Sequence, residues 1–300
     1  MRQYIPLSPV SAAVAGIVLF TAGMLVAFLG ASWLTADPSV DIESIVPLSQ
    51  VNFAGEPMPI DEPHYYTKEK FERELSVTLY SVYQVRLYHK REPLYIPHIE
   101  KRLRDAGVPG DFKYLAIAES ALKNDAVSSA SAAGIWQFIP DTARRYGLIV
   151  NDRIDERFNF EKSTDAAIAY LLDLYERFHD WTLVAAAYNR GENGLERDIA
   201  AQATSSYYDL YLNEETSRYV FRILAIKYVL ENKNRLYDQS ELGSQFELPD
   251  TREVAVKGGT DLRAWVREQG ISYAGFRMLN PWILDEVLPE GTLWHVRLLE

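Results

Sequence analysis

The 300-residue sequence contains no cysteine and no extended basic run. The absence of cysteine excludes a disulfide framework, a zinc ribbon, an iron–sulfur cluster and a thiol nucleophile. The chain has 42 acidic and 31 basic residues, and the net charge of -11 argues against a nucleic acid partner. Low-complexity tracts are also absent, so a fibrous protein is excluded. With 48% hydrophobic residues, the chain is long enough for one large domain or two modest ones.

The histidines do not have the spacing of a metal site. All five are scattered along the chain, without the pattern of a zinc-binding helix (His64, His89, His98, His179 and His295). A phosphate-cradling glycine loop and a Gly-x-Ser-x-Gly elbow are absent as well. We therefore expect neither a metal nor another cofactor.

One long apolar run lies near the N-terminus, from Val14 to Leu34. As a helix these residues would span about 31 Å, the thickness of the hydrocarbon core of a bilayer. Arg2 precedes the run and three acidic residues follow it between positions 37 and 43. The positive-inside rule then predicts a membrane anchor over residues 1–36, with the N-terminus in the cytoplasm and the rest exported. A cleaved signal peptide is the alternative, although the run is longer than a typical signal core.

The composition changes after this anchor. Residues 37–63 carry six acidic residues, five prolines and no basic residue, which predicts an extended linker without a core of its own. Helical periodicity follows, with Phe71, Leu75 and Leu79 at the start of the pattern. Further helices are expected over residues 112–122, 181–188 and 216–230, and a long helix is expected to begin with Ser163 or Thr164 as its cap. These helices predict one helical domain over residues 64–240.

The last fifty residues have a different pattern. Residues 253–256 and 294–298 are typical of strands, and residues 261–268 and 273–279 of short helices. The sequence thus predicts a small βααβ module over residues 250–300. The fold class as a whole is mainly α, with one transmembrane helix in front and this module behind.

Glu119 is the first residue that suggests chemistry. It lies on an apolar stripe with Phe112, Leu115 and Leu122, and a helix from Asp111 would turn this stripe towards the core. No Lys or Arg lies one turn away, so burial should raise the pKa of the carboxyl towards neutrality. A carboxyl that is protonated near pH 7 can act as a general acid. A pair with a distant Arg, or a solvent-facing position, is the structural alternative.

Two later segments have residue types that such an acid could use. Gln137 lies between Trp136 and Phe138, and an amide between aromatic rings can hold a sugar. The spacing alone fits better with the alternative, a helix with Trp136 and Ile139 in the core. Tyr188 and Asn189 end a helix just before a glycine, where they could orient a polar group of a substrate or simply cap the helix.

Taken together, these segments resemble the lytic murein transglycosylases with a goose-lysozyme-like catalytic domain, and most of all the membrane-bound type D branch. The similarity covers residues 64–232. Four motifs carry it in the same order and spacing, namely Glu119-Ser120, Ser128 to Pro140, Ala187 to Gly191, and Glu215-Thr216 with Tyr219-Val220. Smaller matches include Tyr146-Gly147-Leu148 and Ile154 to Arg157.

The resemblance implies a lysozyme-like fold and cleavage of the MurNAc–GlcNAc bond of peptidoglycan without water, which leaves a 1,6-anhydromuramic end. Glu119 would be the sole acid and base, because the muramoyl C6 hydroxyl supplies the nucleophile. Tyr188 would hydrogen-bond near Glu119, Gln137 and Asn189 would hold the substrate, and Ser128 and Glu215 would line the groove. Ser131 differs from the glycine that many members of this family have at this position, and its side chain would narrow the approach to the groove.

Residues 250–300 resemble, more faintly, a divergent LysM module, which would provide a second glycan-binding site. The alternative is a small cap domain that binds nothing. We expect an enzyme anchored in the inner membrane with its catalytic domain in the periplasm. Its partners are peptidoglycan strands and proteins of the cell-wall machinery. A muramidase that activates water through Asp125 or Glu192, and a catalytically silent glycan-binding scaffold, remain as alternative functions.

Overall fold

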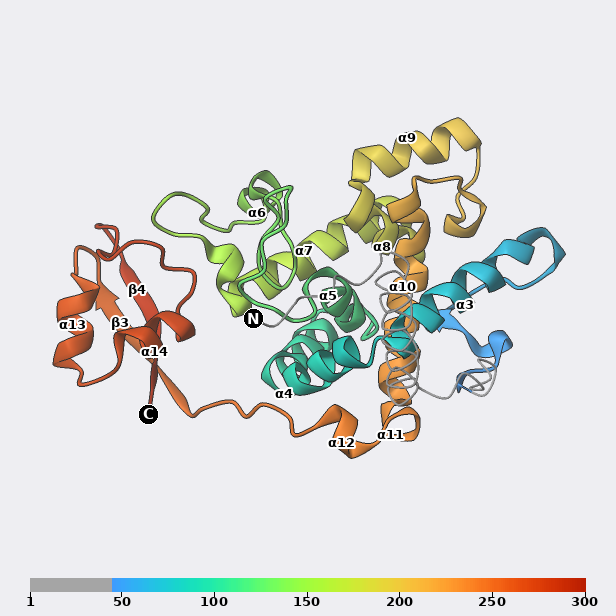
Figure 1. Ribbon diagram of the computed structural model, residues 1–300. Helices are drawn as coiled ribbons and strands as arrows, with labels where there is room; N and C mark the ends of the chain where they lie inside the picture. The colour runs from blue at the N-terminus through green and yellow to red at the C-terminus, as the bar shows by residue number, and fades with distance from the viewer. Residues whose placement is uncertain (1–44) are drawn as a thin grey trace, which may run out of the picture. The chain divides into compact units, whose positions relative to one another are not determined.

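The computed structural model describes residues 45–300, all of which belong to one compact unit. They form a mainly helical fold followed by a small module with two strands (Figure 1). The membrane anchor expected over residues 1–36 lies outside the described residues. Within residues 45–300, we find no helix with both the length and the apolar character needed to cross a membrane.

The helical elements follow one another along most of the described chain. They are α3 (Tyr65–Tyr80), α4 (Val82–Asp105), α5 (Phe112–Ser120), α6 (Pro140–Arg145), α7 (Phe160–Phe178), α8 (Trp181–Arg190), α9 (Glu192–Gln202), α10 (Glu214–Glu231), α11 (Lys233–Leu236), α12 (Gln239–Leu242), α13 (Leu262–Glu268) and α14 (Tyr273–Leu279). The strands are β1 (Asn52–Phe53), β2 (Glu56–Pro57), β3 (Thr251–Lys257) and β4 (Leu293–Leu299).

Helix α10 lies in the middle of the helical part, where it packs against α3, α5 and α8 (Figure 1). Val220, Ile223 and Leu224 are fully buried, and the helix is apolar on most of its sides, as expected of a core helix. Because α5 and α8 both pack against α10, the residues at the C-terminal ends of α5 and α8 lie close together beside α10.

Residues 45–63 are not the extended linker that their composition predicted. Strands β1 and β2 pair in a hairpin, and Phe53 is fully buried with its ring 5.1 Å from that of Phe112. The carboxylate of Glu56 accepts hydrogen bonds from the first two backbone N–H groups of α8, at 2.7 and 2.8 Å. The prolines keep the segment irregular, but burial of a few apolar side chains and this helix cap bind it to the helical core.

Helix α5 begins at Phe112 as predicted, but its cap and its C-terminal end differ from the prediction. The side chain of Asp111 does not cap it; its Oδ2 instead accepts from Lys227 Nζ at 2.8 Å and from the backbone N–H of Ala54 at 2.7 Å. The helix ends at Ser120 because Ala121 and Leu122 both have positive φ, at 55° and 58°. The expected stripe is nevertheless buried, since Phe112, Leu115 and Leu122 are at most 1% exposed.

Helix α7 begins one turn earlier than predicted. Asn159 is its N-cap and accepts from the backbone N–H of Lys162 at 3.1 Å. Ser163 and Thr164, which the sequence suggested as caps, lie inside the helix, and their hydroxyls donate to the carbonyl of Phe160 at 3.2 and 2.7 Å. An asparagine is as good a cap as either hydroxyl, so the correct start could not be chosen from residue type alone.

The C-terminal module has the predicted βααβ order. Strand β3 pairs antiparallel with β4, and α13 and α14 connect them. Its core includes Phe276, Trp282 and Leu288, and also Ile154 from the loop between α6 and α7. The backbone N–H of Asp155 donates to the carbonyl of Trp282 at 2.8 Å. The module and this loop therefore share one apolar core.

Candidate active site

A cavity of about 530 Å³ lies where α5, α8 and α10 meet the loop before α6. All six residues that the sequence singled out line it: Glu119, Ser128, Gln137, Tyr188, Asn189 and Glu215. Tyr219 and Arg222 of α10 and Glu192 at the start of α9 line it as well. Residues separated by almost a hundred positions are thus brought to one site by the packing of three helices.

Glu119 lies in the last turn of α5, half-buried against α10. The hydroxyl of Tyr219 donates a short hydrogen bond to its Oε1. Burial raises the pKa of Glu119 to about 7, against the lowering effects of this hydrogen bond and of the positive charge of Arg222. No basic side chain within residues 45–300 forms an ion pair with Glu119. At neutral pH the carboxyl therefore holds its proton about half of the time, as general acid catalysis requires.

The two tyrosines near Glu119 have different hydrogen-bond partners. Tyr188, which the resemblance placed beside the acid, donates to the backbone carbonyl of Trp136 at 2.7 Å, and Tyr219 donates to Glu119. Burial raises the pKa of both hydroxyls, and the nearby charge of Glu119 raises it further. Sequence reasoning did not name Tyr219 as a site residue, although it belongs to one of the four motifs.

The loop between α5 and α6 has an unusual backbone. Four of the seven non-glycine residues with positive φ in residues 45–300 belong to it: Ala121, Leu122, Ser131 and Gln137. Such conformations cost of the order of 1 kcal/mol each and are common at functional sites. Ser131 has a φ of 62°, a left-handed conformation that glycine adopts more readily than serine.

Contacts with Arg157 hold this loop in place. Its buried guanidinium pairs with Asp155 and donates to the carbonyls of Ser131 and Phe138 at 2.6 and 2.9 Å. Gly134 has a φ of 79°, and a Cβ there would lie 2.0 Å from the carbonyl oxygen of Arg157. Only glycine fits this close approach.

Gln137 and Trp136 have separate surroundings. Gln137 lines the cavity, and its amide nitrogen donates to the carbonyl of Gly134 at 2.8 Å. Trp136 is fully buried, and its indole N–H donates to Thr164 Oγ1 at 3.0 Å. Trp136 is thus a core residue, in a turn rather than the helix considered as its alternative. Phe138 and Ile139 line the cavity instead.

A polar chain connects the end of α8 with the start of α10. Asn189 accepts from the hydroxyl of Thr216 at 2.9 Å, and its amide nitrogen donates to Glu215 Oε1 at 3.2 Å. Asn189 is the ninth residue of α8 and not its cap, since Gly191 follows the helix with a φ of 79°. Ser128, on the loop, accepts from the backbone N–H of Ala132 at 3.1 Å.

The two acids considered for activation of water lie in different places. Asp125 is 74% exposed and does not line the cavity. Glu192 lines it, but its oxygens accept from Arg145 at 2.6 Å and from the hydroxyl of Tyr170 at 2.8 Å. Although burial alone would raise the pKa of Glu192, the hydrogen bonds from Arg145 and Tyr170 lower it overall. Glu119 is thus a carboxyl of this cavity whose pKa burial raises to about 7, whereas the pKa of Glu192 is lowered.

Comparisons with known proteins match both parts of the chain. Residues 97–210 match the family model described as "Transglycosylase SLT domain". Residues 252–294 match the model described as "Soluble lytic transglycosylase C-terminal LysM-like domain". Both matches agree with the resemblance that the sequence motifs indicated.

Two curated proteins are similar over part of their length. Membrane-bound lytic murein transglycosylase D of Escherichia coli strain K12 is 37% identical over 151 residues, which cover 49% of this chain and 33% of that protein. A "Putative tributyltin chloride resistance protein" of Alteromonas sp. strain M-1 is 30% identical over 112 residues, covering 37% of this chain and 54% of the other. The chain spans about a third of the length of the first relative.

Two solved structures match about half of the chain. An inactive mutant of the lytic transglycosylase Slt from Pseudomonas aeruginosa has a TM-score of 0.38 and 20% identity, and covers 48% of this chain and 26% of its own. The 70 kDa soluble lytic transglycosylase from Escherichia coli has a TM-score of 0.40 and 19% identity, and covers 51% and 27%.

Proposed function

We propose that this chain, which carries an SLT transglycosylase domain and a LysM-like C-terminal domain, is a lytic transglycosylase of peptidoglycan. In this proposal it cleaves the β-1,4 bond between MurNAc and GlcNAc and leaves a 1,6-anhydro-MurNAc end. The observation that carries the proposal is Glu119, a cavity carboxyl with a pKa of about 7 and no ion-pair partner among residues 45–300.

The proposed reaction uses this one carboxyl twice. Protonated Glu119 gives its proton to the glycosidic oxygen as the bond from that oxygen to C1 of the muramoyl residue breaks. The C6 hydroxyl of the same residue then attacks C1, and its proton returns to Glu119. No water is consumed, so a second carboxylate is not required.

The surroundings of Glu119 favour both of its proposed states. Burial favours the protonated carboxyl before the reaction. The hydrogen bond from Tyr219 and the charge of Arg222 stabilise the carboxylate that forms after proton transfer. Because burial and these partners oppose each other, the pKa stays near the pH at which the proton must leave and return.

The other lining residues are proposed to hold the sugar. The amide nitrogen of Gln137 is bound to backbone carbonyls, which leaves its amide oxygen to accept from a substrate hydroxyl or N-acetyl group. Asn189 and Glu215 hold each other at the start of α10, and Ser128 lies on the loop at the rim. Tyr188 supports the floor of the site through the carbonyl of Trp136.

We also propose that the enzyme acts on the wall from the outer face of the inner membrane. The apolar run from Val14 to Leu34 supports an anchor, and the curated relative is described as membrane-bound. The LysM-like domain would hold glycan while the SLT domain cleaves it.

Product analysis of digested cell-wall sacculi in isotopically heavy water tests the reaction. We expect unlabelled muropeptides with anhydro ends, because water does not enter the product. Heavy oxygen in the new reducing ends would show a muramidase instead. Release of no muropeptides at all would favour a silent glycan-binding protein.

Glu119→Gln distinguishes catalysis from binding. The amide keeps the shape of the side chain but cannot transfer a proton, so turnover should fall by at least about a thousandfold while binding to sacculi is kept. If the variant retained most of its activity, Glu119 would not be the catalytic acid.

A further inference from the structure

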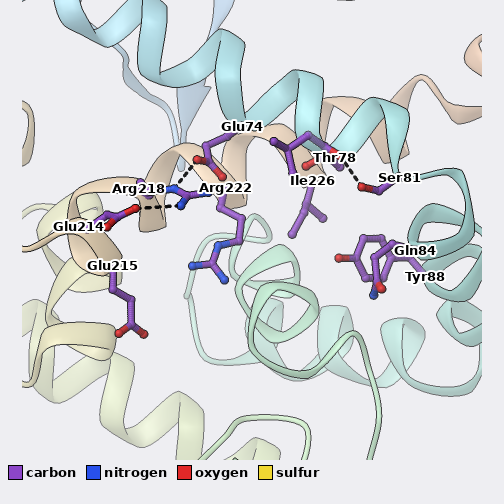
Figure 2. Close-up of a pocket in the computed structure, with 11 residues that line it drawn as sticks. Glu74, Thr78, Ser81, Gln84, Tyr88, Glu214, Glu215, Arg218, Arg222 and Ile226 are labelled. Carbon is purple, nitrogen blue, oxygen red and sulfur yellow. Dashed lines mark hydrogen bonds and ion pairs between the residues drawn. The ribbon is translucent and has the colours of Figure 1, made fainter. Parts of the chain in front are cut away.

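Two walls of the candidate active site are held in place in different ways. One wall is α10, which contributes Tyr219 and Arg222. On its other side α10 borders a second cavity, of about 570 Å³, which shares Arg222; there Glu74 of α3 accepts from Arg218 Nε at 2.7 Å (Figure 2). The other wall is the loop between α5 and α6, which consists of turns and isolated bridges. This loop needs support from elsewhere in the chain.

The support comes from two residues just before α7. Arg157 Nη1 donates to the carbonyls of Ser131 and Phe138, at 2.6 and 2.9 Å. The carbonyl of Phe158 accepts from Asn124 Nδ2 at 2.9 Å, near the start of the loop. Arg157 is buried and does not line the cavity, so its guanidinium acts on the loop and not on a ligand.

The C-terminal module holds the same short segment from the other side. Ile154 is fully buried in the apolar core of the module, and Phe158 packs against that core. Arg153 Nε donates to Asp285 Oδ2 at 2.7 Å, and Arg153 Nη2 donates to the carbonyl of Val287 at 2.9 Å. Residues 153–158, here called the connecting segment, therefore contact both the module and the loop between α5 and α6.

Asp155 joins the two sets of contacts within the connecting segment. Its backbone N–H donates to the carbonyl of Trp282 in the module at 2.8 Å. Its carboxylate accepts from Nε and Nη2 of Arg157 at 2.9 and 2.6 Å, which orients the planar guanidinium so that Nη1 faces the loop. Asp155 and Arg157 are only 5% and 8% exposed. Because close-packed groups cannot shift independently, a displacement of the module would also displace Arg157.

We propose that the C-terminal module is a positioning element of the active site. It holds Asp155 and Arg157 where they fix the loop that carries Ser128 and Gln137. This inference rests on the proposed function, because the loop is proposed to hold the sugar. The module then contributes to turnover itself, separately from any glycan that it binds. Asp155 and Arg157 are positioning residues, since they act through the loop.

A charge reversal at the Arg153–Asp285 pair tests the contact without altering either core. The two side chains are 41% and 39% exposed, so Arg153→Asp should fold, but it places two carboxylates against each other. We expect kcat for anhydro-end formation, per folded protein, to fall about tenfold, since a small displacement of groups that position a substrate is costly. The charge swap, Arg153→Asp with Asp285→Arg, should restore kcat to within about twofold of the wild type.

Arg102→Asp is the matched control. Arg102 Nε on α4 donates to Asp165 Oδ1 on α7 at 2.6 Å, and these side chains are 40% and 51% exposed. Neither residue lines the cavity or belongs to the connecting segment. Reversal of this pair should leave kcat unchanged. A contact with a merely structural role would behave in the same way, because it changes stability in urea and not the kcat of the folded protein.

Hydrogen exchange of the loop gives a readout that does not require activity. Within the loop, the backbone N–H groups of Ala133 and Phe138 each donate to the carbonyl of the other residue, at 3.0 and 3.1 Å. In Arg153→Asp, exchange over residues 126–138 should become at least about tenfold faster while exchange in α10 is unchanged. The charge swap should restore the slow exchange.

Arg157→Lys tests the proposed route from the module to the loop. Lysine keeps the charge but cannot hold Asp155 and two carbonyls at once, so kcat should fall. In this background, adding Arg153→Asp should lower kcat by less than about a further twofold, because both changes act on one path. A further tenfold loss would overturn the route through Arg157. If Arg157→Lys does not fold, the charge swap and the exchange measurement decide.

The outcomes separate this inference from the proposed function. Unchanged kcat and unchanged loop exchange in Arg153→Asp overturn the positioning role while transglycosylase activity stands. A loss of kcat that the charge swap does not restore also overturns it. Absence of anhydro ends with the unaltered chain refutes the proposed function itself, and loop exchange then decides whether the module positions the loop.

Discussion

Replacing Glu119 with glutamine is expected to stabilise the folded protein at neutral and alkaline pH. In the folded state the pKa of Glu119 is about 7, whereas its ordinary value is 4.5. Between these two values the folded state binds more protons than the unfolded state, so the free energy of unfolding falls as the pH rises. The loss is complete above pH 7. Glutamine does not titrate, and its amide oxygen can still accept from Tyr219.

The magnitude follows from the size of the pKa shift. A shift from 4.5 to about 7 corresponds to at most roughly 3 kcal/mol. Glu119 is only partly shielded from solvent, and part of this cost is lost to solvent screening, so we expect a gain of about 1–3 kcal/mol at pH 8. Below pH 4.5 both states of the wild-type carboxyl are protonated and the gain should vanish.

Urea unfolding of both proteins at pH 4.5 and pH 8 measures this difference. Glu268→Gln, which changes an exposed glutamate of α13, is the matched control and should show no such pH-dependent gain. Equal stabilities of Glu119→Gln and the wild type at pH 8 would refute the argument, because the carboxyl would then not be destabilised by burial. A variant that is more stable but less active than the wild type would show that Glu119 serves catalysis at the expense of stability.

Three further changes have expected outcomes. Tyr219→Phe removes a hydrogen bond that lowers the pKa of Glu119, so the alkaline limb of the pH profile of kcat/KM should shift to higher pH by about one unit. A shift of this limb to lower pH would contradict the geometry. Gly134→Ala places a Cβ against the carbonyl oxygen of Arg157 and should cost more than about 3 kcal/mol in urea unfolding, whereas a loss under 1 kcal/mol would show that the loop yields. Ile154→Ala should cost about 2–4 kcal/mol by the same measurement, and a neutral result would mean that the C-terminal module does not share its core with the loop.

Local patterns predicted the secondary structure well where one pattern dominated. The βααβ order of the C-terminal module was correct because strand alternation and helix periodicity are both short-range signals. The start of α7 was wrong because several residues of suitable type compete for one cap. Helix α5 begins at Phe112 as predicted, but Lys227 binds the carboxylate of Asp111, so this side chain does not cap the helix.

Composition misled the prediction for residues 45–63. Prolines and acidic residues are typical of a linker, but Phe53 and Glu56 each find a partner on another element. Such partners are distant in sequence, so no local average detects them. The same holds for Tyr219, which is a hundred positions from the Glu119 to which it donates.

The sequence by itself determined which carboxyl to examine and which residues accompany it, because the apolar stripe around Glu119 and the order of four motifs are written in local spacing. The protonation state of Glu119 and the two cavities that meet at Arg222 were decided only by the tertiary structure. A pKa depends on the removal of water and on charges from every neighbouring element, and a cavity exists only between elements. The packing of α3, α5 and α8 around α10 buries Glu119 and also forms the cavities between these helices.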